Sequence, residues 1–342
     1  MKEKKSFKYP ERVFIIAEIS ANHNQDFELT LQTIDEAGKA GADAVKFQTY
    51  TPDSLSLDVN NEYFGPHKKG LWKGKRPYDL YREAAMPWEW QTELSEHAKS
   101  LGLEWLSSPF DFKAVDFLEN INIPVYKIAS LEITDIPLIK HIASKGKPII
   151  ISTGVANVDD IGLALKTCRD QNNDKVSLLK CTSQYPAPIE AANLNTIPDM
   201  IKRFGVKIGL SDHTPGSIVP VVATGLGAEI IEKHFIIDRS IGGPDASFSM
   251  EPFEFKQMVE DVRNAEKALG KISYEVSQKD RLRRRSLFVT KNIEAGETLT
   301  NENIKSIRPG HGLHPSKLNE IIGKKARKFI AKGTPLSLED LE

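Results

Sequence analysis

Two lysines inside apolar segments are the first residues of this chain whose type and placement could do chemistry. Lys46 lies in DAVKFQ (43–48) and Lys127 lies in PVYKIAS (124–130). A lysine in a buried strand costs free energy unless it is paired or used. Two such lysines, with serine hydroxyls beside them, favour a site for an anion that carries several charges. The serines that would contribute these hydroxyls are Ser130, Ser152 and Ser211.

Two histidines occupy comparable positions farther along the chain. His213 follows the apolar run VKIGLS (206–211), and His234 lies in EIIEKHF (229–235). Either histidine alone would be interpreted as a hydrogen-bonded core residue. A converging pair of imidazoles suits a divalent transition metal whose remaining ligands are water and substrate oxygens. For the pair we therefore favour a metal site beside the anion site.

The elements that must position these residues are short apolar runs that alternate with amphipathic segments. Runs rich in Val, Ile and Leu are typical of parallel strands buried on both faces. Eight strand–helix units predict a closed (β/α)8 TIM barrel of the α/β class, with active-site residues at the C-terminal strand ends. An open doubly wound sheet is the alternative, but no GxGxxG follows the first run. The predicted strands are residues 13–19, 43–48, 103–108, 124–130, 148–153, 176–182, 206–211 and 229–235, and predicted helices include residues 29–40, 88–101, 136–144, 159–169 and 252–269.

Two segments depart from this alternation. The connection from about Thr49 to Pro87 is longer than is usual in such units. It contains Trp72, Tyr78 and Tyr81, and it is either a lid or a surface excursion packed on its own aromatics. Near residue 271 a polar, charged stretch begins, and a small Gly-punctuated segment follows it. We therefore expect a barrel domain (1–270), a linker (271–284) and a small β-rich domain (285–342).

Composition excludes several classes of function. The formal net charge is −1, so no global basic field attracts nucleic acid or acidic membranes. The two cysteines form no CxxC, which argues against a disulfide framework or a cysteine zinc site. The charged N-terminus lacks the apolar core of a signal peptide, and no apolar run is long enough for a transmembrane helix. We expect a cytoplasmic protein with no nucleic-acid or membrane partner.

The strings at the predicted strand ends closely resemble the sialic acid synthase family, from about residue 12 to the end of the chain. They are AEISANH (17–23), VKFQTY (45–50), SSPF (107–110), YKIAS-LE (126–132), STG (152–154), CTSQYPAP (181–188), GLSDHTPG (209–216), EKHF (232–235) and GPDASFSM (243–250). SIRPGHGLHP (306–315) resembles the appended domain of that family, which is similar to type III antifreeze proteins. SSPF or STG alone would carry no information, whereas the whole set is specific.

This resemblance implies a site and a reaction. Phosphoenolpyruvate would be bound by Lys46, Ser108, Lys127, Ser130, Ser152, Ser183 and Ser211, and the amino sugar by Gln48, Glu132, Tyr185, Asp245 and Arg308. A divalent ion, Mn2+ or alternatively Mg2+ or Co2+, would bind His213 and His234 and polarise the sugar aldehyde. Lys46 and Lys127 would offset anionic charge, Glu18 would handle the proton of the attacking water, and Glu132 would also be catalytic. Arg308 would reach the barrel of the other subunit in a domain-swapped homodimer.

The branch of the family decides the sugar. Ser108 and Ser183 differ from the threonine and asparagine of the neuraminic-acid branch, and GLWKGKRPYDLYREAAMPWEW (70–90) resembles the pseudaminic-acid branch. That branch implies 2,4-diacetamido-2,4,6-trideoxy-altrose as the sugar. An N-acetylneuraminate or legionaminate synthase with the same mechanism remains an alternative. A structural protein of polysaccharide or spore-coat assembly is the non-enzyme alternative, although the metal histidines and both lysines are present.

Overall fold

The computed structural model describes residues 7–342 and divides into two compact units. The first unit ends at Gly270 and the second begins at Lys271. The charged N-terminal segment falls in part on residues 1–6, which lie outside the described residues. Among residues 7–342, no helix is long and apolar enough to cross a membrane.

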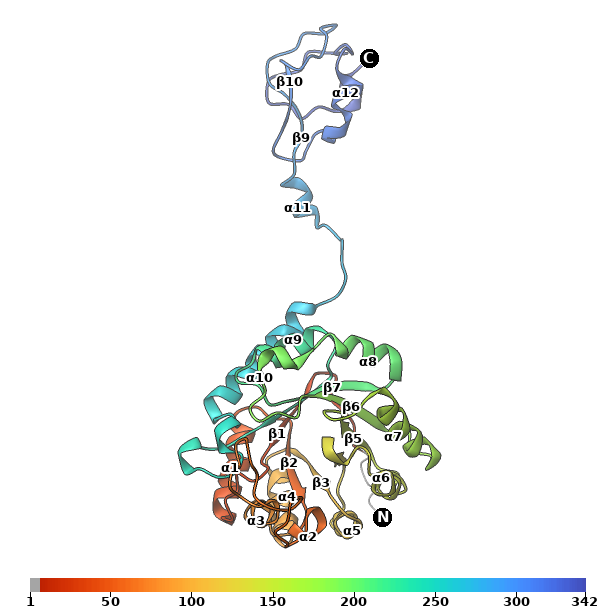
Figure 1. Ribbon diagram of the computed structural model, residues 1–342. Coiled ribbons are helices and arrows are strands. Elements are labelled where there is room, and N and C mark those ends of the chain that lie inside the picture. The colour runs from red at the N-terminus through yellow and green to blue at the C-terminus, as the bar shows by residue number, and fades with distance from the viewer. Residues whose placement is uncertain (1–6) are drawn as a thin grey trace. The chain divides into compact units, whose positions relative to one another are not determined.

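Eight parallel strands form a closed barrel in the first unit (Figure 1). Each strand pairs with the next along the chain, and β8 pairs with β1 to close the ring. The predicted TIM barrel is thereby confirmed, and every predicted strand ends within two residues of the observed one. The strands are β1 (Phe14–Glu18), β2 (Ala44–Thr49), β3 (Glu104–Pro109), β4 (Tyr126–Ile128), β5 (Ile149–Ser152), β6 (Val176–Cys181), β7 (Lys207–Asp212) and β8 (Ile230–His234).

Helices surround the barrel and connect its strands (Figure 1). Side chains fix several of their starts, since Asp26, Asp111 and Asn157 accept hydrogen bonds from otherwise free N–H groups of α1, α5 and α7. The five predicted helices correspond to α1, α4, α6, α7 and α10. The helices of this unit are α1 (Phe27–Lys39), α2 (Pro52–Leu55), α3 (Pro77–Ala84), α4 (Trp90–Ser100), α5 (Phe112–Asn120), α6 (Ile136–Ala143), α7 (Val158–Asp170), α8 (Thr196–Phe204), α9 (Ile218–Gly225) and α10 (Pro252–Leu269).

Alternate strand residues face the barrel interior, because side chains of a strand point to opposite sides in turn. The interior contains its own small hydrophobic cluster, distinct from the larger cluster between strands and helices. Phe7 and Tyr9 pack against this interior cluster and join it from the N-terminal segment. The buried members are Phe14, Ile16, Ala44, Leu106, Val125, Ile150, Leu179 and Ile230. These residues indicate which positions point inward in every barrel strand except β7, which contributes none of them.

The second unit is a small β-rich fold with a hydrophobic core of its own. β9 (Ser286–Val289) pairs antiparallel with β10 (Ile304–Ile307), and isolated bridges tie the remaining extended segments together. Two short helices, α11 (Gln278–Leu282) and α12 (Leu318–Ile321), complete the unit. Its fully buried core residues include Leu287, Ile293, Leu299, Ala326 and Leu336. The predicted small β-rich domain is confirmed.

Candidate active site

A cavity of about 250 Å³ opens where the strands of the barrel end at their C-termini. We call it the central cavity. Its position agrees with the rule that barrel enzymes place their reactive groups at this end of the strands. The predicted residues that line it are Glu18, Lys46, Gln48, Lys127, Ser130, Glu132, Ser152, Tyr185, Ser211, His213, His234 and Asp245.

The alternation along each strand explains why these polar residues converge. Glu18 lies two residues after the interior Ile16, and Lys46 lies two residues after the interior Ala44. The same step leads from Val125 to Lys127, and in β8 from Ile230 to Glu232 and on to His234. These strands therefore place apolar residues in the middle of the barrel and polar residues at their C-terminal ends. The closed barrel then brings them to a single cavity.

Two buried lysines and two buried carboxyls form the floor of the central cavity. Lys46 Nζ lies 2.8 Å from Glu18 Oε2 and 3.6 Å from Glu232 Oε1. Lys127 Nζ lies 3.9 Å from Glu232 Oε1 and donates a hydrogen bond of 2.7 Å to Ser152 Oγ. All four charged side chains are less than a tenth exposed, so their interactions are weakly screened by solvent.

Burial and pairing act differently on the two lysines. Burial opposes the charge of Lys46, but Glu18 and Glu232 together outweigh it and raise its pKa. For Lys127 burial dominates over the attraction of Glu232 and lowers the pKa to about 8. A bound anion would therefore stabilise the charged form of Lys127 more than that of Lys46.

Hydroxyl groups surround this floor. Ser130 lies in the 3-10 turn Ser130–Glu132 after β4, and its Oγ accepts a hydrogen bond of 3.0 Å from Gly154 N–H. A Cβ added at Gly154 would collide with Ser183 Oγ and would lie 2.9 Å from Ser130 Oγ. Ser183 does not itself line the central cavity, yet it stands with Ser130 at Gly154. The missing side chain of Gly154 thus leaves room for both hydroxyls.

Ser108 occupies an inward position of β3, two residues beyond the interior Leu106. Its side chain is 1% exposed, and its Oγ has no hydrogen-bond partner within residues 7–342. A buried hydroxyl without a partner costs free energy. Ser108 does not line the central cavity, but its free hydroxyl is one of the donors that an anion in the barrel would satisfy.

The two histidines lie side by side, with ring centroids 5.3 Å apart. His213 Nδ1 lies 2.9 Å from Thr182 O, which makes Nδ1 a donor, so that Nε2 offers a lone pair to a metal in the neutral ring. His234 Nδ1 is buried without a partner, and burial, followed by the charge of His213, lowers the pKa of His234 well below its ordinary value. Two imidazole nitrogens are thus available to a metal ion.

This donor set fits a metal that is completed by small ligands. The described part of the chain contains no group of three or more His, Cys, Asp or Glu residues arranged to hold an ion. Water and substrate oxygens would have to supply the other ligands of an ion on His213 and His234. The metal on these two histidines stays a prediction.

Hydrogen bonds on one side of the cavity connect the carboxyls to residues assigned to the sugar. Gln48 Nε2 donates to Glu18 Oε1 at 2.9 Å and to Ser20 Oγ at 3.2 Å, and Ser20 Oγ donates to Asp245. Glu132 differs, because its Oε2 is buried without a hydrogen-bond partner among the described residues. Burial, opposed in part by Lys46, raises the pKa of Glu18 to about 7. Burial, opposed in part by Lys127, raises the pKa of Glu132 to about 7.

The long connection after β2 forms the upper part of the central cavity. We call residues 50–86 the capping segment. Trp72 Nε1 donates a hydrogen bond of 3.0 Å to Pro244 O, and the Trp72 ring lies 6.0 Å from the ring of Tyr185. Tyr81 also lines the cavity. The segment therefore covers the site rather than packing only on its own aromatics.

Two residues that matter to the cavity were absent from the prediction. Glu232 bridges both lysines and accepts a hydrogen bond of 3.0 Å from Ser211 Oγ. Its position two residues before His234 was the signal that could have found it. Cys181 also lines the cavity, and although burial opposes the charged form, hydrogen bonding to His213 lowers its pKa to about 7.

Some polar residues at strand ends face away from the cavity, and one predicted site residue belongs to the second unit. Lys233 points outward and binds Asp212 Oδ2 at 2.5 Å and Thr214 O, so it is a structural lysine. Arg308 lies in the second unit and is exposed. Its predicted role in the sugar site therefore stays a prediction.

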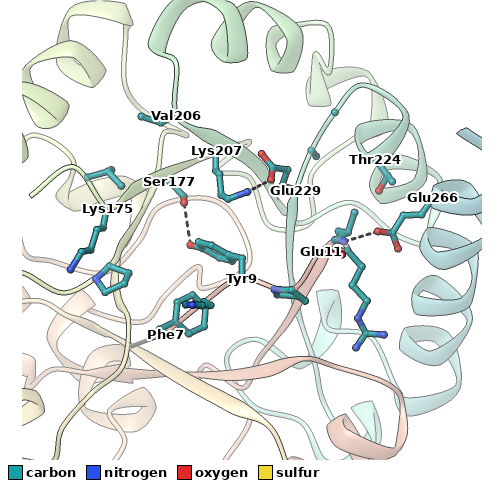
Figure 2. Close-up of a pocket in the computed structure, with 18 of the residues that line it drawn as sticks. Phe7, Tyr9, Glu11, Lys175, Ser177, Val206, Lys207, Thr224, Glu229 and Glu266 are labelled. Carbon is teal, nitrogen blue, oxygen red and sulfur yellow. Dashed lines mark hydrogen bonds and ion pairs between the residues drawn. The ribbon is translucent and has the colours of Figure 1, made fainter. Parts of the chain in front are cut away.

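A larger cavity of about 1060 Å³ lies near the N-terminal ends of the strands. Figure 2 shows that Tyr9 lies at its centre, with Ser177, Lys207 and Glu229 nearby. The Tyr9 hydroxyl is 3.1 Å from Ser177 Oγ, and Lys207 pairs with Glu229. None of the predicted site residues lines it. Residues at this end of a barrel usually serve stability, so size alone does not make this cavity the active site.

Similarity to known proteins covers both units. The chain matches the NeuB family over residues 33–274 and the SAF domain over residues 284–342. It is 47% identical to a pseudaminic acid synthase of Helicobacter pylori over 96% of this chain and 97% of that protein. It is 44% identical to a pseudaminic acid synthase of Campylobacter jejuni over 98% of this chain and 99% of that protein. A solved N-acetylneuraminic acid synthetase of Leptospira borgpetersenii has a TM-score of 0.70 and 33% identity over 79% of this chain and 90% of that one.

Proposed function

Because the chain belongs to the NeuB family and ends in a SAF domain, we propose that its barrel condenses phosphoenolpyruvate with an open-chain amino sugar. The chain is an enzyme of the nonulosonic acid synthase type, which forms a C–C bond. Its sugar is 2,4-diacetamido-2,4,6-trideoxy-altrose, and its products are pseudaminic acid and phosphate. The observation that carries the proposal is the convergence of two buried lysines, several serines and two histidines in one cavity.

The floor of the central cavity is suited to phosphoenolpyruvate. Lys46 and Lys127 supply positive charge in a site shielded from water, where each charge is worth more than at the surface. Hydroxyl donors surround them, so the carboxylate and phosphate oxygens can be satisfied individually. The serines assigned to this substrate are Ser108, Ser130, Ser152, Ser183 and Ser211.

A divalent metal ion, Mn2+ in the first place, is assigned to His213 and His234. When bound there, such an ion polarises the aldehyde oxygen of the sugar as a Lewis acid. Treatment with a chelator should abolish turnover, and added Mn2+ should restore it. The histidine variants His213→Ala and His234→Ala should lose Mn2+ binding, measured by calorimetry, while they retain the far-ultraviolet circular dichroism of the barrel. Full activity after chelation would contradict the assignment.

Protein groups are assigned to two proton transfers of the reaction. Carbon 3 of phosphoenolpyruvate attacks the aldehyde carbon, and the carbonyl oxygen becomes an alkoxide that needs a proton. Glu132, with its raised pKa and free Oε2, supplies that proton. Water adds to the cationic carbon 2, and Glu18 takes its proton. The tetrahedral intermediate loses phosphate by C–O cleavage, and its hydroxyl proton passes to the departing phosphate, which leaves a carbonyl at carbon 2, while Lys46 and Lys127 offset the charge of the leaving group.

The sugar is assigned to polar residues that line the cavity at and beyond the strand ends. Gln48, Glu132, Tyr185 and Asp245 present amide, carboxyl and phenol groups there. Arg308 is assigned to the same sugar, supplied by a second subunit of a domain-swapped homodimer. A guanidinium group in that position would bind acetamido or hydroxyl oxygens through its fork of N–H donors. The two cysteines are buried and unpaired, which supports a cytoplasmic location.

A panel of sugars tests the proposed substrate. The purified protein is incubated with phosphoenolpyruvate, Mn2+ and, in separate reactions, the diacetamido-trideoxy-altrose, the corresponding legionaminic precursor or N-acetylmannosamine. Phosphate release should be fastest with the altrose sugar. Equal or faster release with either other sugar would replace the pseudaminic assignment by that of the corresponding synthase. No release with any sugar would favour the structural-protein alternative.

A further inference from the structure

The central cavity has two unlike halves. Its floor carries the buried charges described above, whereas the part next to the capping segment is aromatic and apolar. We call that part the upper wall. It comes from the residue after β2, from α3 and from the residue after β3, and its members are Tyr50, Leu80, Tyr81, Ala84 and Phe110.

The upper wall is packed before any sugar binds. The Tyr50 ring centroid lies 6.1 Å from that of Tyr81 and 5.3 Å from that of Phe110, both in edge-on geometry. Tyr50 is 4% exposed and Leu80 is 6% exposed. Aromatic pairs in such geometry hold one another in place. The wall is therefore a preformed surface.

Two phenol groups of the upper wall lack hydrogen-bond partners. Among residues 7–342, neither the Tyr50 nor the Tyr81 hydroxyl has one. Burial, followed by the charge of Asp245, raises the pKa of Tyr50, and burial, followed by the charge of Glu132, raises the pKa of Tyr81. Both hydroxyls therefore stay protonated and can donate. Both tyrosines line the central cavity together with Asp245 and Glu132, two residues assigned to the sugar.

The direction of the sugar follows from the chemistry of the floor. The aldehyde carbon must lie next to carbon 3 of phosphoenolpyruvate, above the lysines and histidines. The other end of the six-carbon chain then extends away from the floor, toward the capping segment. In the proposed sugar this end carries an acetamido group at carbon 4 and a methyl group at carbon 6.

We infer that the upper wall is the subsite that selects the carbon 4 to carbon 6 end of the sugar. Leu80, Ala84 and Phe110 contact the carbon 6 methyl and the acetyl methyl, and the hydroxyls of Tyr50 and Tyr81 bind the 4-acetamido group. A sugar with hydroxyls at carbons 4 and 6 would bury a polar group against apolar side chains and would leave the phenols unpaired. This inference rests on the proposed function and adds specificity residues to it.

Two tyrosines of α3 provide a matched pair for the test. Tyr81 lines the cavity with a free hydroxyl, whereas Tyr78 lies outside the cavity and its hydroxyl donates to Asp53 at 3.1 Å. Tyr81→Phe and Tyr78→Phe each remove one oxygen from the same helix. kcat/KM is measured for the altrose sugar and for N-acetylmannosamine, the latter as a competitive inhibitor where turnover is undetectable. The KM for phosphoenolpyruvate is measured alongside.

Tyr81→Phe should lower kcat/KM for the altrose sugar about tenfold and change the value for N-acetylmannosamine less than about twofold. Tyr50→Phe should act in the same direction, and Tyr78→Phe should change neither value. The KM for phosphoenolpyruvate should stay constant in all three variants. An equal loss with both sugars, or an altered KM for phosphoenolpyruvate, would overturn the inference. If the wild type prefers N-acetylmannosamine, the substrate assignment fails separately, while the shift in sugar ratio still decides whether this wall selects the sugar.

Discussion

Buried charge in the central cavity is largely balanced before substrate binds. Two lysines face two carboxyls, and Glu232 contacts both lysines. A buried ion pair adds little net stability, but removing one partner leaves an uncompensated charge. The two carboxyls therefore hold both lysines in place in the cavity. Removing any one of the four residues should affect stability as well as the binding of an anion.

Replacing either buried lysine should chiefly impair the use of phosphoenolpyruvate. Lys46→Ala and Lys127→Ala each remove a charged contact worth about 1.5–3 kcal/mol, or roughly 10- to 150-fold in kcat/KM for phosphoenolpyruvate. Lys233→Ala is the control, since this buried strand lysine faces Asp212 away from the cavity. It should lower the free energy of unfolding and leave the KM for phosphoenolpyruvate unchanged. A wild-type kcat/KM in either cavity variant would make that lysine structural.

Glu132 should make the stability of the protein depend on pH. Its pKa is raised by burial from an unfolded value near 4.5 to about 7. The folded state therefore binds this proton more tightly, so stability is fully present below about pH 4.5 and is lost as pH rises through about 7. The free energy of unfolding, measured with urea, should fall in the wild type by up to about 3 kcal/mol between pH 5 and pH 8 because of this group. Glu132→Gln should remove this fall. Glu104→Gln, at the exposed start of β3, serves as control. Parallel pH profiles for wild type and Glu132→Gln would refute the assignment.

At the scale of elements, the turns after the strands decide which hydroxyls meet. Gly154 follows β5, and its N–H and missing Cβ bring Ser130 and Ser183 together from the ends of β4 and β6. Neither strand places these two serines next to one another by alternation alone. The STG string is thus explained by the space that its glycine leaves.

Gly154→Ala should raise the KM for phosphoenolpyruvate several-fold without unfolding the barrel. The new Cβ would push aside the Ser183 and Ser130 hydroxyls, which are ends of small side chains and can move. Gly162→Ala is a suitable control, because a Cβ there meets nothing within 4 Å. Steady-state kinetics with both substrates and a thermal melt of each variant would separate the effects. An unchanged KM for phosphoenolpyruvate in folded Gly154→Ala would exclude these serines as its ligands.

At the scale of the whole molecule, the second unit carries a residue assigned to the site of the first. Arg308 is exposed in a turn whose Gly310 and Gly312 lie against backbone atoms of Arg281 and Leu287, where a Cβ has no room. The turn is therefore held firmly within its own unit. The contact of Arg308 with a partner subunit stays a prediction.

Mixed dimers should reveal whether Arg308 acts across subunits. Arg308→Ala and His213→Ala are each expected to be inactive or nearly so. A swapped dimer of one subunit of each kind would contain one intact barrel with one intact Arg308, so mixing should restore part of the activity. Phosphate release is measured after co-expression with two different affinity tags and isolation of the mixed species. Mixed dimers that form but stay as inactive as their parents would show that Arg308 does not act in trans.

The order and type of the elements were readable from the sequence, because strand burial on both faces is a local property of apolar runs. The lysines Lys46 and Lys127 and the pair His213 and His234 stood out for the same reason, since polar residues are rare in such runs. Motif resemblance supplied the family and the reaction. Local patterns also distinguished strands from helices and placed most of their ends within two residues of the observed ends.

The tertiary structure decided what the residues do to one another. Lys233 and His234 are neighbours in the sequence, yet one binds Asp212 outside the barrel and the other faces the cavity. Glu232 became visible as the bridge between two lysines only when closure of the barrel brought β8 beside β1. The role of the capping segment likewise depended on its contacts with Pro244 and Tyr185. Such relations join residues far apart in the chain, and no local pattern encodes the distance between them.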